Sequence, residues 1–451
     1  MPKFYDVLVV GAGPAGLLAA LAAARTGMRV GLLERKEDPG RIERLCGQTL
    51  VSANDYYFDD LVMASPERGC ISFPHNGLSF AYDGPLKNLY GWHIYTPDGG
   101  RMAFGIPSET RTGGEAGVVG YAYDKEALLR GLLAEVRRTG VDVHGGVDVE
   151  RIEMLPSSVK AFGGGTAYEG SYIIAADGTN SRMARAAGMN EGRTFYCYLL
   201  AKGFRMRGLK VPEPDILISS ITYTTAAPGF MFIFPRPQEG EHMVTFLALE
   251  PTADLAAVAA SFMRESPYVS SWFSGAEQLE QLASAQYIYS PVVEPCRGRM
   301  LLAGDAGSCQ ELENSGAMIC GWRAGLAAAA AVKEERADIA PRALSGYMRW
   351  WKRTYVEQCP HDVYLMNFAL PYVLDAEEDL NFLFSLIREP MAPCWNPYAA
   401  IGHIGGLIQK LAPEIQARRP ELLHKLGRMQ LPMTEVLARA TKACGPVGDL
   451  L

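Results

Sequence analysis

The sequence predicts an α/β protein in which a nucleotide-binding domain is interrupted by an antiparallel β domain and followed by helices. Three observations support this. Residues 4–35 read as strand, glycine turn, helix and strand; aromatic stretches near residues 70–110 and 195–290 alternate in hydrophobicity; and a proline-broken helical pattern runs from about residue 336 to the end. The first segment is typical of a Rossmann-type βαβ unit.

The segments FYDVLVV and MRVGLLE are apolar without interruption, as expected for parallel strands covered on both faces. A second helix and strand follow at residues 124–154, with Gly140 where a C-terminal cap belongs. We assign residues 1–70, 110–190 and 291–335 to the nucleotide-binding domain. Residues 71–109 and 191–290 are assigned to an antiparallel substrate-binding domain, and residues 336–451 to a C-terminal helical region.

Composition excludes several classes of protein. The chain has 451 residues, is 48% hydrophobic and carries a net charge of −7 without any Lys/Arg run, so a nucleic-acid partner is not expected. The N-terminus enters a strand directly, which favours a cytoplasmic location. The apolar run from Gly325 to Val332 is shorter than the roughly 18–20 residues that span a bilayer, so no transmembrane segment is expected. Nine scattered cysteines without a CxxC pair favour reduced thiols and no metal site.

A glycine motif follows the first strand, and an acid ends the next strand, 18 residues after the motif. The motif consists of Gly11, Gly13, Pro14, Ala15 and Gly16, and the acid is Glu34. Glycines permit a tight turn, close approach of a pyrophosphate and close packing of helix on strand, while the helix N-terminus offers N–H groups to the phosphates. The acid is placed to accept hydrogen bonds from ribose hydroxyls. The pattern therefore predicts dinucleotide binding.

Two later apolar strands each end at an acid beside a glycine, Asp177 with Gly178 and Asp305 with Gly304. Taken singly, each acid is either a turn or N-cap residue or a ligand contact at the crevice beyond the strands. Together, and in this order after the glycine motif, they favour FAD over NAD. The second acid can hold the ribityl chain, and the last helix can point at the flavin ring.

At these residues the sequence resembles the p-hydroxybenzoate-hydroxylase-like FAD-dependent oxidoreductases. Within them it is most similar to the geranylgeranyl reductase family, which reduces isoprenoid double bonds. Leu45-Cys46-Gly47 resembles the family's cysteine–glycine segment near the flavin, and Gly120-Tyr121 before Lys125 stands at its GY…R helix start. Gly229 to Pro235 resembles its aromatic strand. The resemblance covers about residues 3–335, with a helical tail in the same place, and implies a Rossmann-type FAD-binding domain with an inserted antiparallel β substrate domain.

The resemblance also implies further contacts to the FAD, from Arg35, Arg44, Cys46, Gly47, Lys125, Val149, Gly316 and Ala317. Two departures from the family pattern lie within this set. Lys125 stands where the family usually has Arg, which keeps the charge but loses bidentate geometry. The loop from Ser308 to Gly316 lacks the family's proline and is more acidic.

Three residues are candidates for catalysis. Cys46 is either a proton donor or nucleophile beside the flavin, or a buried apolar thiol. Glu311 and Glu313 precede a predicted helix and are either cap residues favoured by the helix dipole or acids of the active site.

Aromatic residues mark the candidate substrate site. Phe230, Phe232 and Phe234 alternate along one predicted strand, so their side chains share a face. That face is either core or the wall of an apolar substrate pocket, which Trp92 could also line.

The leading interpretation is an FAD-dependent oxidoreductase that reduces carbon–carbon double bonds in a hydrophobic, isoprenoid-like or polycyclic substrate. The alternatives are a flavin-dependent aromatic monooxygenase and an electron-transfer flavoprotein that passes electrons to a quinone. The expected partners are a hydrophobic small molecule and, as electron donor, NAD(P)H or a reduced carrier protein. Peripheral contact with a membrane is compatible with such a substrate.

Overall fold

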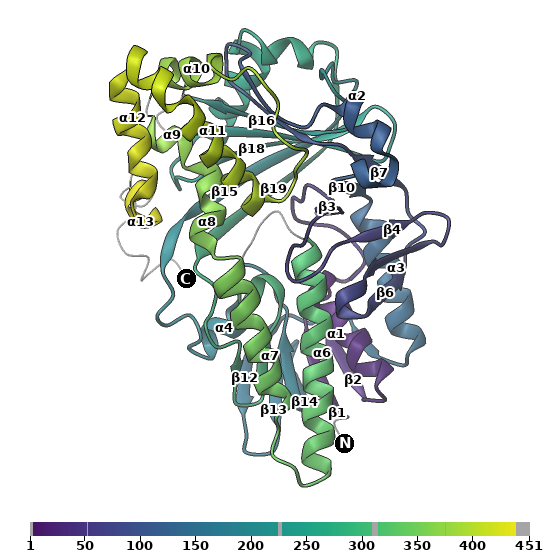
Figure 1. Cartoon of the computed structure of the whole chain (residues 1–451). Coiled ribbons are helices and arrows are strands. Elements are labelled where there is room, and N and C mark those ends of the chain that lie inside the picture. The colour runs from purple at the N-terminus through teal and green to yellow at the C-terminus, as the bar shows by residue number, and fades with distance from the viewer. Residues whose placement is uncertain (1–2, 52, 224–227, 309–313, 375, 439–451) are drawn as a thin grey trace.

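The computed structural model describes residues 3–51, 53–223, 228–308, 314–374 and 376–438. The glycine turn sits on an eight-stranded sheet in the lower body of the molecule (Figure 1). Parallel strands follow the order β11-β2-β1-β14-β21. The strand order therefore reverses between β1 and β14, with β2 and β11 on one side of β1, and β14 and β21 on the other. The strands of this sheet are β1 (Phe4–Val10), β2 (Val30–Leu33), β11 (Asp142–His144), β14 (Thr166–Ala175), β21 (Met300–Leu302) and the antiparallel β12 (Val149–Met154), β13 (Val159–Gly163) and β20 (Cys296–Arg297).

Two apolar helices pack closely against each other beside this sheet, α1 (Pro14–Arg25) and α6 (Asn314–Arg336). A Cβ on Gly321 would lie 2.0 Å from the carbonyl oxygen of Ala15, so only glycine permits this approach. α6 is long and apolar enough to cross a membrane, which corrects the expectation that no apolar segment reaches this length. However, 72% of its most apolar stretch is buried inside the protein.

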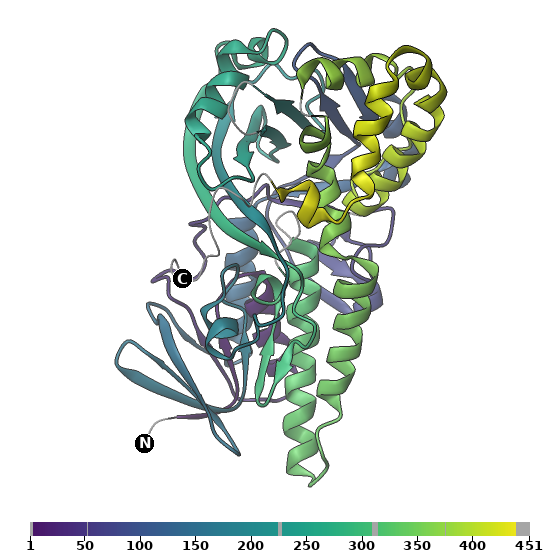
Figure 2. The same ribbon diagram turned by 90° about the vertical axis from the view of Figure 1, so that its left-hand side faces the viewer.

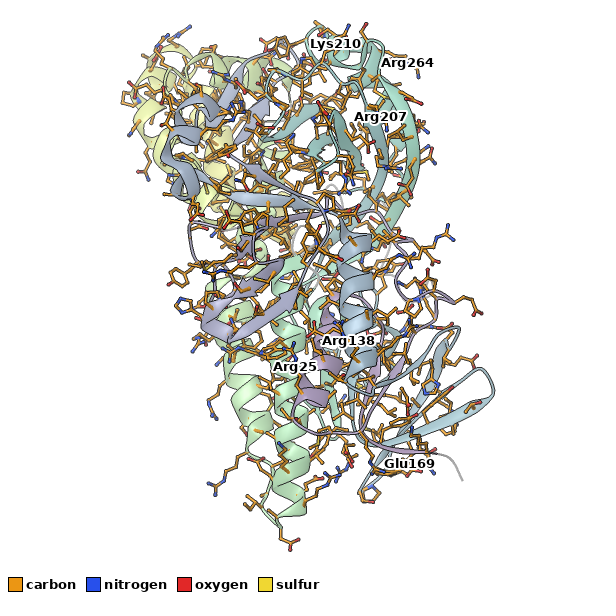
Figure 3. All side chains as sticks on the ribbon, turned by 90° about the vertical axis from the view of Figure 1, so that its right-hand side faces the viewer. Arg25, Arg138, Glu169, Arg207, Lys210 and Arg264 are labelled. Carbon is orange, nitrogen blue, oxygen red and sulfur yellow. The ribbon has the colours of Figure 1, made fainter. Side chains whose placement is uncertain are left out.

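The helix predicted in the first part of residues 124–154 is confirmed as α3 (Lys125–Arg138). The Asp124 side chain accepts a hydrogen bond from the Ala127 N–H at 3.0 Å and caps its start. Gly140, with φ of +81°, follows its end in the left-handed conformation expected of a C-terminal cap. An ion pair between Arg25 and Glu135 joins α3 to α1, and Figure 3 shows Arg25 and Arg138 at the ends of these two helices.

A seven-stranded sheet forms the upper body, in the order β19-β15-β18-β17-β16-β8-β9. Its long strands β15 and β19 form the bent pair that runs between the two bodies in Figure 2. The bounds are β8 (Trp92–Tyr95), β9 (Arg101–Phe104), β15 (Phe195–Arg207), β16 (Leu217–Thr222), β17 (Gly229–Pro235), β18 (Glu241–Ala248) and β19 (Glu277–Tyr289).

The prediction of one antiparallel sheet from residues 71–109 and 191–290 is wrong in two details. First, β16 pairs with β8 in parallel. Second, of residues 71–109 only β8 and β9 enter this sheet, because the other strands there pair locally in two three-stranded sheets. The small sheets consist of β4 (Met63–Ser65), β5 (Cys70–Phe73) and β6 (Leu78–Ala81), and of β3 (Thr49–Val51), β10 (Gly120–Tyr123) and β7 (Leu86–Leu89).

The C-terminal region is helical, as predicted. α7 runs alongside α6, and the later helices lie beside the upper sheet (Figures 1 and 2). Their contact with the sheet is made partly by aromatic rings, since Phe368 lies 5.3 Å from Phe230 and 6.2 Å from Phe232 between ring centroids. The helices are α7 (Ala343–Trp351), α8 (His361–Leu365), α9 (Leu370–Val373), α10 (Glu377–Ser385), α11 (Pro397–Arg418), α12 (Pro420–Gly427) and α13 (Met433–Val436).

Candidate active site

A cleft of about 640 Å³ opens beyond the carboxyl ends of β1, β2, β14 and β21. This volume is typical of a cofactor site, for which about 300–1,000 Å³ is usual. The cleft lies where the strand order reverses, between β1 and β14, and such sheets bind ligands at this point. Most of the predicted cofactor residues line the cleft: Gly11, Gly13, Pro14, Ala15, Glu34, Arg35, Arg44, Cys46, Lys125, Val149, Asp177, Gly178, Asp305 and Ala317.

Glycine is needed at the three motif positions for different physical reasons. A Cβ on Gly11, whose φ is +101°, would lie 2.3 Å from the Ala176 carbonyl oxygen, and one on Gly16 would lie 1.8 Å from the Gly11 carbonyl oxygen. At these two positions the fold itself requires glycine, because any side chain would clash with the backbone. A Cβ on Gly13 would meet nothing within 4 Å, although Gly13 lines the cleft. Because no side chain caps α1 at Gly13, the first N–H groups of the helix remain for an anionic ligand.

The carboxylate of Glu34 is buried and holds the glycine turn by hydrogen bonds. Its Oε2 accepts a hydrogen bond from the Ala12 N–H at 2.6 Å, and its Oε1 accepts one from the Lys36 N–H at 2.9 Å. An ionised carboxylate has about four acceptor sites, so capacity remains for ribose hydroxyls.

We predict that Glu34→Ala weakens FAD binding without abolishing it. A hydrogen bond to a charged group contributes about 1.5–3 kcal/mol, which corresponds to roughly a 10- to 150-fold higher Kd. Quenching of flavin fluorescence on titration of the apoprotein measures this Kd. Thermal unfolding of the two apoproteins separates a lost ribose contact from a loosened turn, and an unchanged Kd would mean that the ribose is held elsewhere.

Both strand-end acids line the cleft, and one of them also accepts a hydrogen bond from the first turn of a helix. Asp177 accepts hydrogen bonds from the Ser181 hydroxyl at 2.7 Å and the Met183 N–H at 3.2 Å, at the start of α4 (Arg182–Ala186). Burial raises the pKa of the Asp177 carboxyl, and these hydrogen bonds partly counter the effect. The Asp305 carboxylate forms an ion pair with the Arg44 guanidinium, with 3.5 Å between Oδ2 and Nη1, and both residues line the cleft.

The Cys46 sulfur lies at the cleft edge, where three hydrogen-bond donors converge on it. The Lys125 ammonium nitrogen is 3.4 Å from Sγ, the Gln48 backbone N–H nitrogen 3.4 Å and the Asn314 amide nitrogen 3.5 Å. Burial raises the pKa of the Cys46 thiol, but the Lys125 charge and the hydrogen bonds from Asn314 and Gln48 outweigh it, so the pKa lies below its ordinary value. The inert apolar thiol is therefore the weaker interpretation of Cys46.

The remaining predicted cofactor residues serve packing. Gly16 packs on the glycine turn, and a Cβ on Gly304, whose φ is +61°, would lie 2.9 Å from the Ala15 methyl carbon. Gly47 lies against the Phe234 ring, where a Cβ would come within 2.9 Å, and Gly316 lies against the Phe58 ring. These four positions pack beside the cleft and are not among its lining residues, and their contact with FAD stays a prediction. Glu311 and Glu313 lie outside the described residues.

An apolar pocket lies between the upper sheet and the C-terminal helices. Its volume is about 60 Å³, and Trp92, Phe230 and Phe232, which were assigned to the substrate site, line it. Phe234 does not line it but stacks on Phe232, with 6.0 Å between ring centroids and 18° between planes. Since Phe234 also covers Gly47, an aromatic column of Phe234 and Phe232 joins the cysteine segment to the pocket.

Several residues of these sites were not predicted from the sequence. Asn314 reaches Cys46 only because α6 begins beside the cleft, and Gln48 contributes through its backbone in a left-handed turn with φ of +55°. The helical side of the pocket comprises residues such as Phe368, Trp395 and Ile401. In the sequence, only the apolar character of the C-terminal tail indicated that it could form this side of the pocket.

Comparisons with known proteins agree with the predicted family resemblance. Residues 6–40 match the family model of FAD-dependent oxidoreductases. The digeranylgeranylglycerophospholipid reductase of Methanothrix thermoacetophila is 23% identical over 400 residues, which cover 85% of this chain and 91% of that protein. The resemblance to the geranylgeranyl reductase family is thereby confirmed.

Solved structures show the same fold. A geranylgeranyl bacteriochlorophyll reductase-like protein from Thermoplasma acidophilum has 20% identity and a TM-score of 0.67, covering 95% of this chain and 99% of that chain. A variant of the halogenase PltM in complex with FAD has 16% identity and a TM-score of 0.56, covering 98% and 97%. The open space above Gly13, the buried Glu34 and the uncapped start of α1 fit the adenosine pyrophosphate half of FAD.

Proposed function

We propose that this chain, an FAD-dependent oxidoreductase similar to the geranylgeranyl reductases, reduces carbon–carbon double bonds of a hydrophobic, isoprenoid-like substrate. The observation that carries the proposal is the aromatic column of Phe234 and Phe232, which leads from Cys46-Gly47 at the cofactor cleft to the apolar pocket. Relatives named digeranylgeranylglycerophospholipid reductase support the same chemistry.

When bound, FAD supplies the hydride that an alkene reduction requires. The chain's own residues orient the cofactor, exclude water and provide a proton. Gly13, the start of α1 and Glu34 fix the nucleotide half, while Asp177 and Asp305 stand at the strand ends within the cleft. Cys46 is our candidate for delivering the proton, because its neighbour Gly47 lies against Phe234, which stacks on the pocket residue Phe232.

The pocket favours an alkene over a polar substrate. Its lining is almost entirely apolar, and its few polar members include Ser219, whose hydroxyl already accepts a hydrogen bond from the Trp92 indole N–H at 2.8 Å. Its volume of about 60 Å³ holds only a few water molecules. An isoprenoid chain therefore has to displace side chains of α11 and its neighbours, and the closed pocket keeps bulk water from the reacting carbons.

The two alternative functions are less well supported. An aromatic monooxygenase would share the FAD cleft, but the named relatives are reductases. The likeness to the halogenase PltM reflects the fold alone. The relatives named above are lipid reductases, and neither is named as an electron carrier to a quinone.

We propose NAD(P)H or a reduced carrier protein as the electron donor. Anaerobic mixing of the oxidised holoenzyme with each candidate tests this, because only a true donor bleaches the flavin absorbance at a catalytically competent rate.

We predict that Cys46→Ser retains FAD and fold but loses most turnover, because a serine hydroxyl is too weak an acid for the proton step. General acid catalysis usually contributes about 100- to 10,000-fold, and a loss in this range is expected. The measurement is steady-state formation of the saturated product, analysed by mass spectrometry. Cys70→Ser, a half-buried cysteine of β5 outside the cleft lining, is the matched control. Normal turnover by Cys46→Ser would show that the proton has another source.

A further inference from the structure

The donors around Cys46 form an arrangement that alkene reduction alone does not require. A neutral thiol is a weak hydrogen-bond donor and acceptor, yet Sγ faces the Lys125 ammonium, the Asn314 amide nitrogen and the Gln48 N–H at 3.4–3.5 Å. The one acceptor given for Sγ, the Asn314 side-chain oxygen, is more distant at 3.9 Å. Three donors, one of them charged, complement a sulfur that carries a negative charge. The arrangement therefore matches a thiolate.

The groups come from separate elements, so the arrangement is built by the tertiary fold. Lys125 is the first residue of α3, and its N–H donates to the Gln48 side-chain oxygen at 2.9 Å, which ties α3 to the cysteine segment. Asn314 is the first residue of α6 and is buried. The backbone of Gln48 adopts a left-handed conformation with φ of +55°, which is uncommon for a residue other than glycine.

Two further titratable groups interact with Cys46. Tyr123, at the end of β10, is fully buried, and burial and the charge of Cys46 raise its pKa, so the phenol stays neutral. Arg236, just after β17, is 3% exposed and donates to the Tyr123 carbonyl oxygen at 2.9 Å. Burial lowers the pKa of Arg236, while Asp124 and Cys46 counter the effect. Among the described groups, the cations Lys125 and Arg236 both favour a negative sulfur.

We propose that Lys125 and Asn314 are positioning residues that hold Cys46 as a thiolate in the resting enzyme, and that the Lys125–Cys46 pair together supplies the proton for the substrate. The inference rests on the proposed function. In the reaction, a bound and reduced FAD would supply a hydride to one alkene carbon, which leaves the other carbon to take up one proton. The ammonium proton of Lys125 passes to Sγ and from Sγ to the other carbon, which leaves a thiolate and a neutral amine, and solvent then reprotonates the amine.

Lysine suits this role better than arginine. An ammonium group can pass a proton to an adjacent thiolate, whereas a guanidinium stays protonated in proteins. Arginine at this position would still stabilise the thiolate by its charge. Lys125→Arg therefore separates the electrostatic role from the transfer of the proton, while Lys125→Met removes both.

The test uses the oxidised holoenzyme labelled with 13C at the cysteine Cβ atoms, with FAD in excess. The Cys46 signal is identified by its absence in Cys46→Ser, and its chemical shift reports thiol or thiolate through a pH titration. We expect Cys46 to be a thiolate at neutral pH. Lys125→Met and Asn314→Leu should each move the titration midpoint upward, and Lys125→Arg should leave it low. Lys333→Met is the matched control, because this exposed lysine lies on α6 roughly 28 Å from Asn314.

Turnover provides the second readout. Lys125→Arg should lose about 100-fold or more in kcat with little change in KM, although its thiolate persists. A thiol at Cys46 throughout the neutral range, or a midpoint that Lys125→Met leaves unchanged, would overturn the proposal. Full turnover by Lys125→Arg would overturn the transfer of the proton. If the titration behaves as expected but the enzyme reduces no alkene, the proposed function fails and the ionisation of the pair stands.

Discussion

Gly13→Val is expected to purify without FAD while its polypeptide remains folded. The backbone at Gly13 has φ of −74° and ψ of −179°, an extended conformation that valine adopts readily. Its Cβ would meet nothing within 4 Å because it projects into the cleft. The branched side chain would then occupy the space that a pyrophosphate needs beside the start of α1.

The measurement is the ratio of flavin to protein after purification and after reconstitution with excess FAD. Loss of a bound cofactor lowers the apparent melting temperature by linkage, so the proper reference for stability is the wild-type apoprotein. Gly16→Val is the contrasting variant, because a Cβ there would lie 1.8 Å from a backbone oxygen and the fold itself should fail. Stoichiometric flavin in Gly13→Val would place the phosphates elsewhere.

Phe232→Asp is expected to retain FAD and to lose substrate binding. Phe232 is 5% exposed, lines the apolar pocket and stacks on Phe234. A carboxylate in this apolar wall has no partner, and a cost of about 3 kcal/mol or more corresponds to at least roughly 100-fold weaker substrate binding. KM for an isoprenoid substrate, with FAD content measured in parallel, reports the effect.

A charge at a buried position also lowers the stability of the fold, so a second variant is needed. Ile401 lines the same pocket from α11 but is only half-buried, and Ile401→Asp should raise KM while the protein stays folded. Gln409, an exposed residue of the same helix, provides the matched control Gln409→Asp. Equal KM values for Ile401→Asp and Gln409→Asp would move the substrate site away from this pocket.

The nucleotide site was predictable because its signals are local in sequence. The glycines, the apolar strands and Glu34 are each required by the geometry of one βαβ unit, and the cleft confirms where they lie. The glycines at positions 47, 304 and 316 were assigned to the cofactor, but they pack against Phe234, Ala15 and Phe58. A single sequence does not distinguish a glycine needed for a ligand from one needed for a neighbouring side chain.

The surroundings of Cys46 were only partly predictable. Lys125 and Cys46 were both assigned to the cofactor site, yet their contact depends on how α3 meets the cysteine segment 79 residues away. Asn314 lies 268 residues from Cys46 and carries no local motif. Likewise, alternation predicted that Phe230 and Phe232 share a face, but their contact with Phe368 depends on how the C-terminal helices pack.

The central claim is that this flavoprotein reduces an alkene, and one anaerobic experiment tests it most directly. The holoenzyme is reduced with one equivalent of dithionite, mixed with a geranylgeranyl lipid and followed by flavin absorbance, with products identified by mass spectrometry. We expect the flavin to reoxidise with one double bond saturated per FAD, and at a much lower rate in Ile401→Asp. Reduced enzyme that stays reduced with the lipid, but consumes oxygen stoichiometrically and yields a hydroxylated product on admission of air, would contradict the account.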